Sequence, residues 1–156
     1  MSLVDADGRD ASDTATILVV DDDPLTLQGT ARLLGKSGYA VSVAHSGSEC
    51  LELASYLRPD LVLLDVVLPD IDGIAVCRQL KQNTDLTDTF VVLLTGKKTH
   101  SDQKAVGIHT GADDYIARPL GNKELLARVG LLLDMRHQRR AIRESERQYR
   151  LLFENM

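Results

Sequence analysis

Residues 16–44 read TILVVDDDPLTLQGTARLLGKSGYAVSVA, and this stretch decides the fold class. The apolar run at its start has the length of a strand, and Asp23 followed by Pro24 offers a helix N-cap with proline at the first helical position. Apolar residues then recur at the spacing of a helix that buries one face, and a second strand-length run ends the stretch. The stretch therefore predicts a strand, a helix and a further strand.

The same alternation continues along the chain. Further strand-length apolar runs cover residues 61–64, 90–94 and 115–117, and segments with helical spacing lie between most of them. The first, third and fourth runs are rich in Ile, Val and Leu without alternation, as expected of strands buried on both faces. Strands that alternate with helices in this way predict an α/β domain with a doubly wound parallel sheet.

The chain divides into three predicted parts. Residues 1–15 are polar and lack apolar periodicity, so we expect a flexible N-terminal arm. Residues 16–133 form the predicted globular domain. Its last helix begins near Asn122, and the absence of Gly and Pro beyond it predicts an extended C-terminal helix to about Phe153, so that residues 134–156 form a helical linker.

The linker carries a seven-residue apolar repeat. Met135, Ile142 and Tyr149 are seven residues apart, and Leu152 follows three residues later. A solvated charged helix is one interpretation of this Arg- and Glu-rich segment, but the repeat favours a helix that dimerises or transmits a signal.

Composition limits the function classes. The 156 residues carry a net charge of −5, which argues against direct nucleic-acid binding. Cys50 and Cys77 have no metal-ligand spacing and lie on core stripes, and no apolar segment is long enough to cross a membrane. A protein of the reducing cytoplasm, without membrane partners, is the natural expectation.

Polar residues gather where the predicted strands end. In an open parallel sheet, ligands bind beyond the C-terminal ends of the strands. Clustered carboxylates repel one another unless a cation joins them, and carboxylate oxygens are ligands that suit Mg²⁺. One carboxylate could then attack a phosphoryl group while a hydroxyl and a cation hold its oxygens. The residues at these ends are, in chain order, Asp21, Asp22, Asp23, Asp65, Thr95 and Arg118.

Four motifs carry a family resemblance. ILVVDDDP, PDLVLLDVVLPDIDGI, VVLLTG and GADDYIARPL occur in this order between residues 17 and 120. Together they resemble the receiver domains of two-component response regulators, of the chemotaxis-receiver type, over about residues 16–133. The resemblance implies a flavodoxin-like five-stranded sheet of order 2-1-3-4-5, which brings the first and third strands together.

The resemblance also implies roles for the site residues. Asp65 would be the phosphoacceptor, with Thr95 as the switch hydroxyl and Tyr115 as the aromatic residue that reports the position of Thr95. The acidic pair would be Asp21 and Asp22. Direct Mg²⁺ ligands would be Asp22, Asp65 and the backbone carbonyl of Val67.

Partners and output follow from the same resemblance. The phosphoryl donor would be a histidine kinase or a phosphotransfer protein. The domain would catalyse only its own phosphorylation and dephosphorylation, and would signal through residues 101–111 and 114–117 and the C-terminal helix. The ending SERQYRLLFENM resembles the entrance of PAS sensor domains, so a following PAS or other output domain is expected, and a homodimer is a further candidate.

Arg118 departs from the family pattern. Receivers usually carry Lys at this position, before a proline whose peptide bond is cis. Arg keeps the charge but presents a wider planar fork. We therefore expect phosphorylation that is slower, or less tightly coupled to the switch.

Two alternatives stand beside this interpretation. Arg118 would suit a pseudo-receiver that binds partners without being phosphorylated. Asp21 would be the nucleophile if its Asp-x-Asp sequence belonged to a phosphatase of the haloacid-dehalogenase type, although Leu25 and the short chain fit that family poorly.

Overall fold

The computed structural model describes residues 14–96 and 111–154. Its five strands form one parallel sheet in the order β2-β1-β3-β4-β5, as the resemblance implied. Asp65, Thr95 and Asp114, which flank the predicted apolar runs, are themselves strand residues. The strands are β1 (Thr16–Val20), β2 (Ala40–Ala44), β3 (Leu61–Asp65), β4 (Phe90–Thr95) and β5 (Asp114–Ala117).

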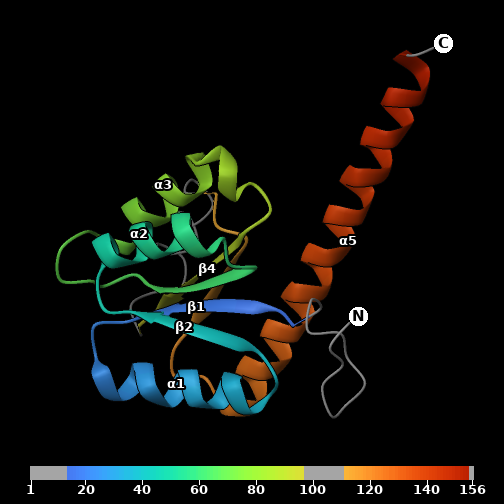
Figure 1. Ribbon diagram of the computed structural model, residues 1–156. Coiled ribbons are helices and arrows are strands. Elements are labelled where there is room, and N and C mark those ends of the chain that lie inside the picture. Colours follow the sequence, from blue (N-terminus) through green and yellow to red (C-terminus); the bar gives the residue numbers. More distant parts are fainter. Residues whose placement is uncertain (1–13, 97–110, 155–156) are drawn as a thin grey trace.

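Helices cover both faces of this sheet (Figure 1). The helical elements are α1 (Pro24–Lys36), α2 (Gly47–Leu57), α3 (Gly73–Gln82), the short 3-10 helix η2 (Thr84–Leu86) and α5 (Asn122–Glu154). The extended C-terminal helix is thus confirmed. Figure 1 shows α2 and α3 on one side of the sheet and α1 with the first part of α5 on the other, while the rest of α5 projects away from the body.

Alternate strand residues build two separate cores, because successive side chains of a strand point to opposite faces. Leu18 and Val20 of β1 pack with the α2 and α3 side, and Ile17 and Val19 pack with the α1 and α5 side. Both cysteines are buried in the first core, as predicted, and burial raises the pKa of Cys50 to about 12.

Arginines fasten α5 to the sheet at the end opposite the candidate site. Arg136 Nη2 lies 3.0 Å from the Asp60 carboxylate, and its Nε donates to the Asp88 carbonyl at 2.7 Å. Arg143, about two turns further along the helix, forms an ion pair with Asp88. Asp60 precedes β3 and Asp88 precedes β4, so these contacts hold α5 against the N-terminal ends of two central strands.

Several sequence predictions fall outside the described residues, namely most of the N-terminal arm and residues 101–110 of the predicted output face. The carbonyl of Ala15 accepts a hydrogen bond from Ala40 N, so the backbone pairs with β2 just before β1 begins. Within residues 14–96 and 111–154, no helix is both long and apolar enough to cross a membrane.

Candidate functional site

Backbone hydrogen bonds hold the polar residues at the C-terminal edge of the sheet. The Asp21 N–H donates to the Ala44 carbonyl at 3.1 Å, which extends the pairing of β1 with β2 past the end of β1. The Arg118 N–H donates to the Thr95 carbonyl at 2.7 Å, which does the same for β5 and β4. Asp65 is the last residue of β3, between these two strand pairs. The sheet therefore brings together residues that are far apart in sequence.

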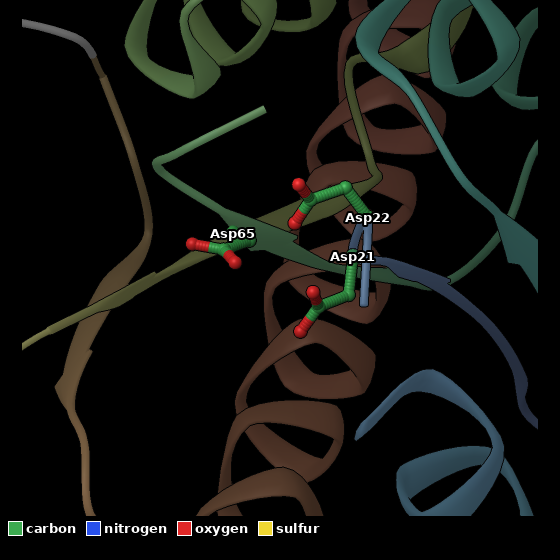
Figure 2. A group of neighbouring side chains, drawn as sticks. All are labelled: Asp21, Asp22 and Asp65. Carbon is green, nitrogen blue, oxygen red and sulfur yellow. The ribbon is translucent and has the colours of Figure 1, made fainter. Parts of the chain in front are cut away.

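Three carboxylates converge at this edge. One oxygen from each of Asp21, Asp22 and Asp65 lies within 4.8 Å of the other two. Figure 2 shows Asp21 and Asp22 next to each other after β1, with both carboxylates turned toward the side on which Asp65 lies. Asp21 is only 2% exposed, Asp65 is half-buried and Asp22 is exposed. The cluster predicted from the strand ends is therefore formed.

Arg118 spans two of these carboxylates. Its Nη2 lies 3.1 Å from Asp21 Oδ2, and its Nη1 lies 3.6 Å from Asp65 Oδ2. Asp21 Oδ1 accepts a hydrogen bond from the Asp23 N–H, but within residues 14–96 and 111–154 the buried Oδ2 accepts no hydrogen bond of good geometry. One arginine cannot offset three carboxylates, and the under-coordinated oxygen together with the all-oxygen donor set fits a hard divalent cation.

The environment of Asp65 disfavours its charged form. Burial raises the pKa of its carboxyl group above the ordinary value, and the nearby carboxylate of Asp21 acts in the same direction. A hydrogen bond from the Val67 N–H, at 3.1 Å, and the charge of Arg118 oppose these effects without cancelling them. In the absence of metal, the surroundings of Asp65 therefore destabilise its ionised form relative to its protonated form.

A pH prediction follows for Asp65→Asn in metal-free buffer. The folded-state pKa of Asp65 lies above the unfolded value of about 3.9. The free energy of unfolding therefore falls as the pH rises from the unfolded pKa to the folded pKa, because Asp65 ionises more readily in the unfolded chain. We expect Asp65→Asn to melt at a higher temperature than the wild type at pH 7, and the difference to shrink as the pH falls and Asp65 becomes protonated. Thermal denaturation followed by circular dichroism at several pH values measures this, and a variant that is less stable at pH 7 would contradict it.

Thr95 and Tyr115 share one face of the sheet. Leu93 is paired with Tyr115 and Thr95 with Ala117, so Tyr115 and Thr95 are diagonal neighbours on adjacent strands. Partial burial raises the pKa of the Tyr115 phenol, and the nearby Thr95 hydroxyl lowers it to a smaller extent. The Thr95 hydroxyl is itself buried and has no hydrogen-bond partner of good geometry among the described residues, so it could donate to a group that arrives at the carboxylate cluster.

The loop after β3 is closed tightly around Asp65. Val67 is exposed, and its N–H donates to Asp65 Oδ1, while the Gly73 N–H donates to the Val66 carbonyl at 2.8 Å. A Cβ at Gly73 would lie 2.3 Å from the Asp65 carbonyl oxygen and 2.6 Å from Val66 Cα. Only glycine allows this approach, which was not foreseen from the sequence.

Asp70 and Asp72 shape this region without joining the cluster. The Asp70 carboxylate accepts hydrogen bonds from the N–H groups of Gly47 and Ser48 in the first turn of α2. A hydrogen bond from the Ser48 side chain, followed by these two N–H groups, lowers the pKa of Asp70. Asp72 accepts from the Ile74 N–H as the N-cap of α3. Both aspartates therefore stabilise helix N-termini instead of belonging to the carboxylate cluster.

The peptide bond between Arg118 and Pro119 is cis, as the family pattern implied. The family model described as the response regulator receiver domain matches residues 17–130 of this chain. The chain belongs to the response regulator receiver domain family. As a receiver domain it is a signalling domain that accepts phosphorylation, and it is not a conventional enzyme.

Relatives of this receiver domain agree in sequence and in structure. Response regulator MprA of Mycobacterium ulcerans is 44% identical over 117 residues, which cover 75% of this chain and 49% of that protein. The receiver domain of a signal transduction histidine kinase from Syntrophus aciditrophicus aligns with a TM-score of 0.72 at 35% identity, covering 78% of this chain and 91% of its own.

The BeF3-activated N-terminal receiver domain of Klebsiella pneumoniae RstA aligns with a TM-score of 0.69 at 36% identity, covering 76% of this chain and 97% of its own. The receiver domain described here spans about half the length of the curated relatives it matches.

Proposed function

We propose that the receiver domain accepts a phosphoryl group on Asp65 in a reaction that depends on Mg²⁺. Asp22, Asp65 and the Val67 carbonyl would hold the ion directly, with Asp21 beside them. The observation that carries this proposal is the convergence of Asp21, Asp22 and Asp65 within 4.8 Å of one another. Mg²⁺, when bound, would supply positive charge that offsets the charge on the transferring oxygens.

Asp65 is the nucleophile in this proposal. One of its carboxylate oxygens forms a bond to the phosphorus of a phosphohistidine, the phosphorus–nitrogen bond breaks, and the imidazole leaves with the electron pair. The side chain of Asp65 is 15% exposed, so a donor can reach it, whereas that of Asp21 is 3% exposed. Asp65 is therefore the better placed of the two to react.

Thr95, Arg118 and Tyr115 would read the phosphorylated state. The buried Thr95 hydroxyl can donate to a phosphoryl oxygen, and Arg118 can hold another electrostatically. Movement of Thr95 toward the phosphoryl group would open space beside it for Tyr115, and so bias a two-state equilibrium of the face that includes β5. We therefore expect that Thr95→Val loses the coupling between phosphorylation of Asp65 and the conformation of the face that includes β5.

Membership of the receiver family also supports a proposal for the partners. A histidine kinase or a phosphotransfer protein would supply the phosphoryl group, and α5 would pass the change to a PAS or other output domain after residues 134–156. We also propose that the protein is cytoplasmic and that the receiver domain ends near residue 133. The domain would catalyse its own phosphorylation and dephosphorylation. No direct contact with nucleic acid or membrane is expected.

The test is incubation of the whole chain with acetyl phosphate, followed by intact-mass measurement. We expect the mass of one added phosphoryl group in the presence of Mg²⁺ and none when EDTA replaces the metal. No mass gain under either condition, together with failure to bind beryllofluoride, would favour a pseudo-receiver that only binds partners.

The phosphatase alternative has a separate signature. A haloacid-dehalogenase-type enzyme would turn over a generic phosphomonoester, and Asp21→Asn would abolish that turnover while Asp65→Asn would not. The burial of Asp21 and the family match both argue against it.

Arg118→Lys tests the departure from the family pattern. In the structure Arg118 contacts both Asp21 and Asp65. Its contact with Asp21 must therefore break before the guanidinium group can bind a phosphoryl group on Asp65. A charge-assisted hydrogen bond contributes about 1.5 kcal/mol, so we expect Arg118→Lys to be phosphorylated by acetyl phosphate roughly tenfold faster. Initial rates from intact mass measure this change.

Arg128→Lys is the matched control for that substitution. Arg128 Nη2 pairs with Asp114 at 3.1 Å, outside the carboxylate cluster, so this variant should keep the wild-type rate. A wild-type rate and an unchanged output in Arg118→Lys would show that the arginine has no influence on the switch.

A further inference from the structure

One side of α5 carries exposed apolar side chains along most of the helix. Leu131 is 58% exposed, Met135 45%, Ile142 61%, Tyr149 63% and Leu152 69%. The intervals between them are four, seven, seven and three residues, so all five occupy the a and d positions of one heptad register. The apolar stripe, as we call these five residues, therefore follows one seam of the helix surface, in which two d positions are polar; exposed Leu151 and Phe153 lie outside it.

The body of the domain occupies a different side of α5. Val129 and Leu132 are buried against the sheet, and Arg136 and Arg143 pair with residues at the N-terminal ends of its strands. These residues fall at the b and e positions of the same register, about 100° around the helix from the a and d seam. The apolar stripe is thus turned away from its own body and is open to a partner along its whole length.

The end of α5 also lacks support from the described body. Arg143 makes the last ion pair between α5 and the rest of the described chain, and residues 144–154 are exposed throughout. Isolated helices of this length are marginal in water, and most helix stability in proteins comes from packing of an apolar face. An unbroken helix through residue 154 is therefore best explained by packing along its apolar stripe.

We propose that the apolar stripe is a dimer interface, on which a second copy of this chain packs as a parallel, in-register two-stranded coiled coil. The register runs from Leu131 to Leu152 without interruption inside one helix. This proposal goes beyond the phosphoryl chemistry and does not depend on it, because none of the stripe residues belongs to the carboxylate cluster.

The two polar residues of the seam select the parallel orientation. Gln138 and Ser145 occupy the remaining d positions and are exposed. In a parallel dimer each d residue faces its own equivalent, so glutamine meets glutamine and serine meets serine. An antiparallel dimer pairs a with d, which would place these polar groups against Met135, Ile142 or Tyr149 and leave their hydrogen bonds unmade.

Charge complementarity supports the same register. Asp134 occupies a g position and faces the e position five residues further along the other helix, which is residue 139. Arg139 lies 3.4 Å from Asp113 of its own chain, but its side chain is 53% exposed, so in the dimer it would be shared between Asp113 and Asp134 of the other copy. The following g positions are Ala141 and Gln148, which are uncharged, so no g and e pair of this register brings like charges together. The register therefore has one attractive pair across the seam and no repulsive one.

Single-cysteine variants of the whole chain test the geometry. Because Cys50 and Cys77 are buried, the wild type should form no intermolecular disulfide under mild oxidation with a glutathione buffer. Both Gln138→Cys and Ser145→Cys should form disulfide-linked dimers, since two d positions can each meet their equivalent only in a parallel, in-register pair. Arg147→Cys, at an outward f position, is the matched control and should remain uncrosslinked.

Light scattering of the whole chain measures the assembly directly. We expect a mass of about twice the 17.1 kDa of one chain at high concentration. Ile142→Asn should give a single-chain mass, and its circular dichroism should lose no more than the helical signal of the residues beyond Arg143. Asp65→Asn should still dimerise, which separates this proposal from the proposed phosphorylation.

A single-chain mass for the wild type at all concentrations would overturn the proposal and leave the stripe to a different protein. Equal crosslinking of Ser145→Cys and Arg147→Cys, or crosslinking at only one of the two d positions, would also overturn it.

Discussion

Asp65→Asn is expected to gain no phosphoryl group from acetyl phosphate in the presence of Mg²⁺, whereas the wild type gains one. Asparagine preserves the size and shape of the side chain at the end of β3 but replaces the nucleophilic carboxylate with an amide. It also removes one of the three carboxylates that lie within 4.8 Å of one another, so metal binding should weaken at the same time. The expected effect on phosphorylation is therefore complete loss, measured by intact mass.

Asp23→Asn is the matched control for this loss. Asp23 follows Asp21 and Asp22 directly and is exposed, but its carboxylate accepts from the Thr26 hydroxyl instead of joining the cluster. The substitution removes the same charge from the same edge of the sheet, so general electrostatics would affect both variants alike. Full phosphorylation of Asp65→Asn, or equal loss in Asp23→Asn, would be incompatible with the proposed role of Asp65.

Gly73→Ala is expected to have the largest effect on stability. The added Cβ would lie 2.3 Å from the Asp65 carbonyl oxygen and 2.8 Å from that of Val66, and both atoms belong to the backbone. Backbone at the end of a buried strand cannot shift without disturbing the sheet, so we expect the free energy of unfolding to fall by about 3 kcal/mol. For a chain of this size the melting temperature should fall by roughly 10 °C.

Gly29→Ala provides the comparison for the glycine substitution. Gly29 lies inside α1, and a Cβ there would meet no atom within 4 Å. Alanine in a helix is more stable than glycine by about 0.5–1 kcal/mol, so this variant should melt slightly higher than the wild type. Thermal denaturation of both variants decides the matter, and an unchanged melting temperature for Gly73→Ala would refute the steric explanation.

The sequence could predict the sheet and the residues at its edge because both depend on local pattern. Apolar runs of strand length, separated by segments with helical spacing, are enough to specify a parallel α/β sheet. Once the sheet is parallel, residues such as Asp21, Asp65 and Thr95 must share its C-terminal edge wherever they lie in the chain. The sequence therefore indicates which side chains meet, although not at what distances.

Contacts between distant side chains could not be predicted in the same way. Arg118 contacts Asp21 as well as Asp65, and Asp70 caps α2 across 23 residues of sequence. The pairing of Arg143 with Asp88 likewise depends on where α5 crosses the sheet. No periodicity specifies these pairs, because they arise only when the packed elements fix the reach and direction of each side chain.

The most direct test of the central claim is a crystal structure of this chain with Mg²⁺ and beryllofluoride. We predict one metal ion ligated by the carboxylates of Asp22 and Asp65 and by the Val67 carbonyl, with beryllofluoride on Asp65 and both Thr95 and Arg118 turned toward it. Carboxylates that point apart, with no ion between them and no beryllofluoride on Asp65, would contradict the account.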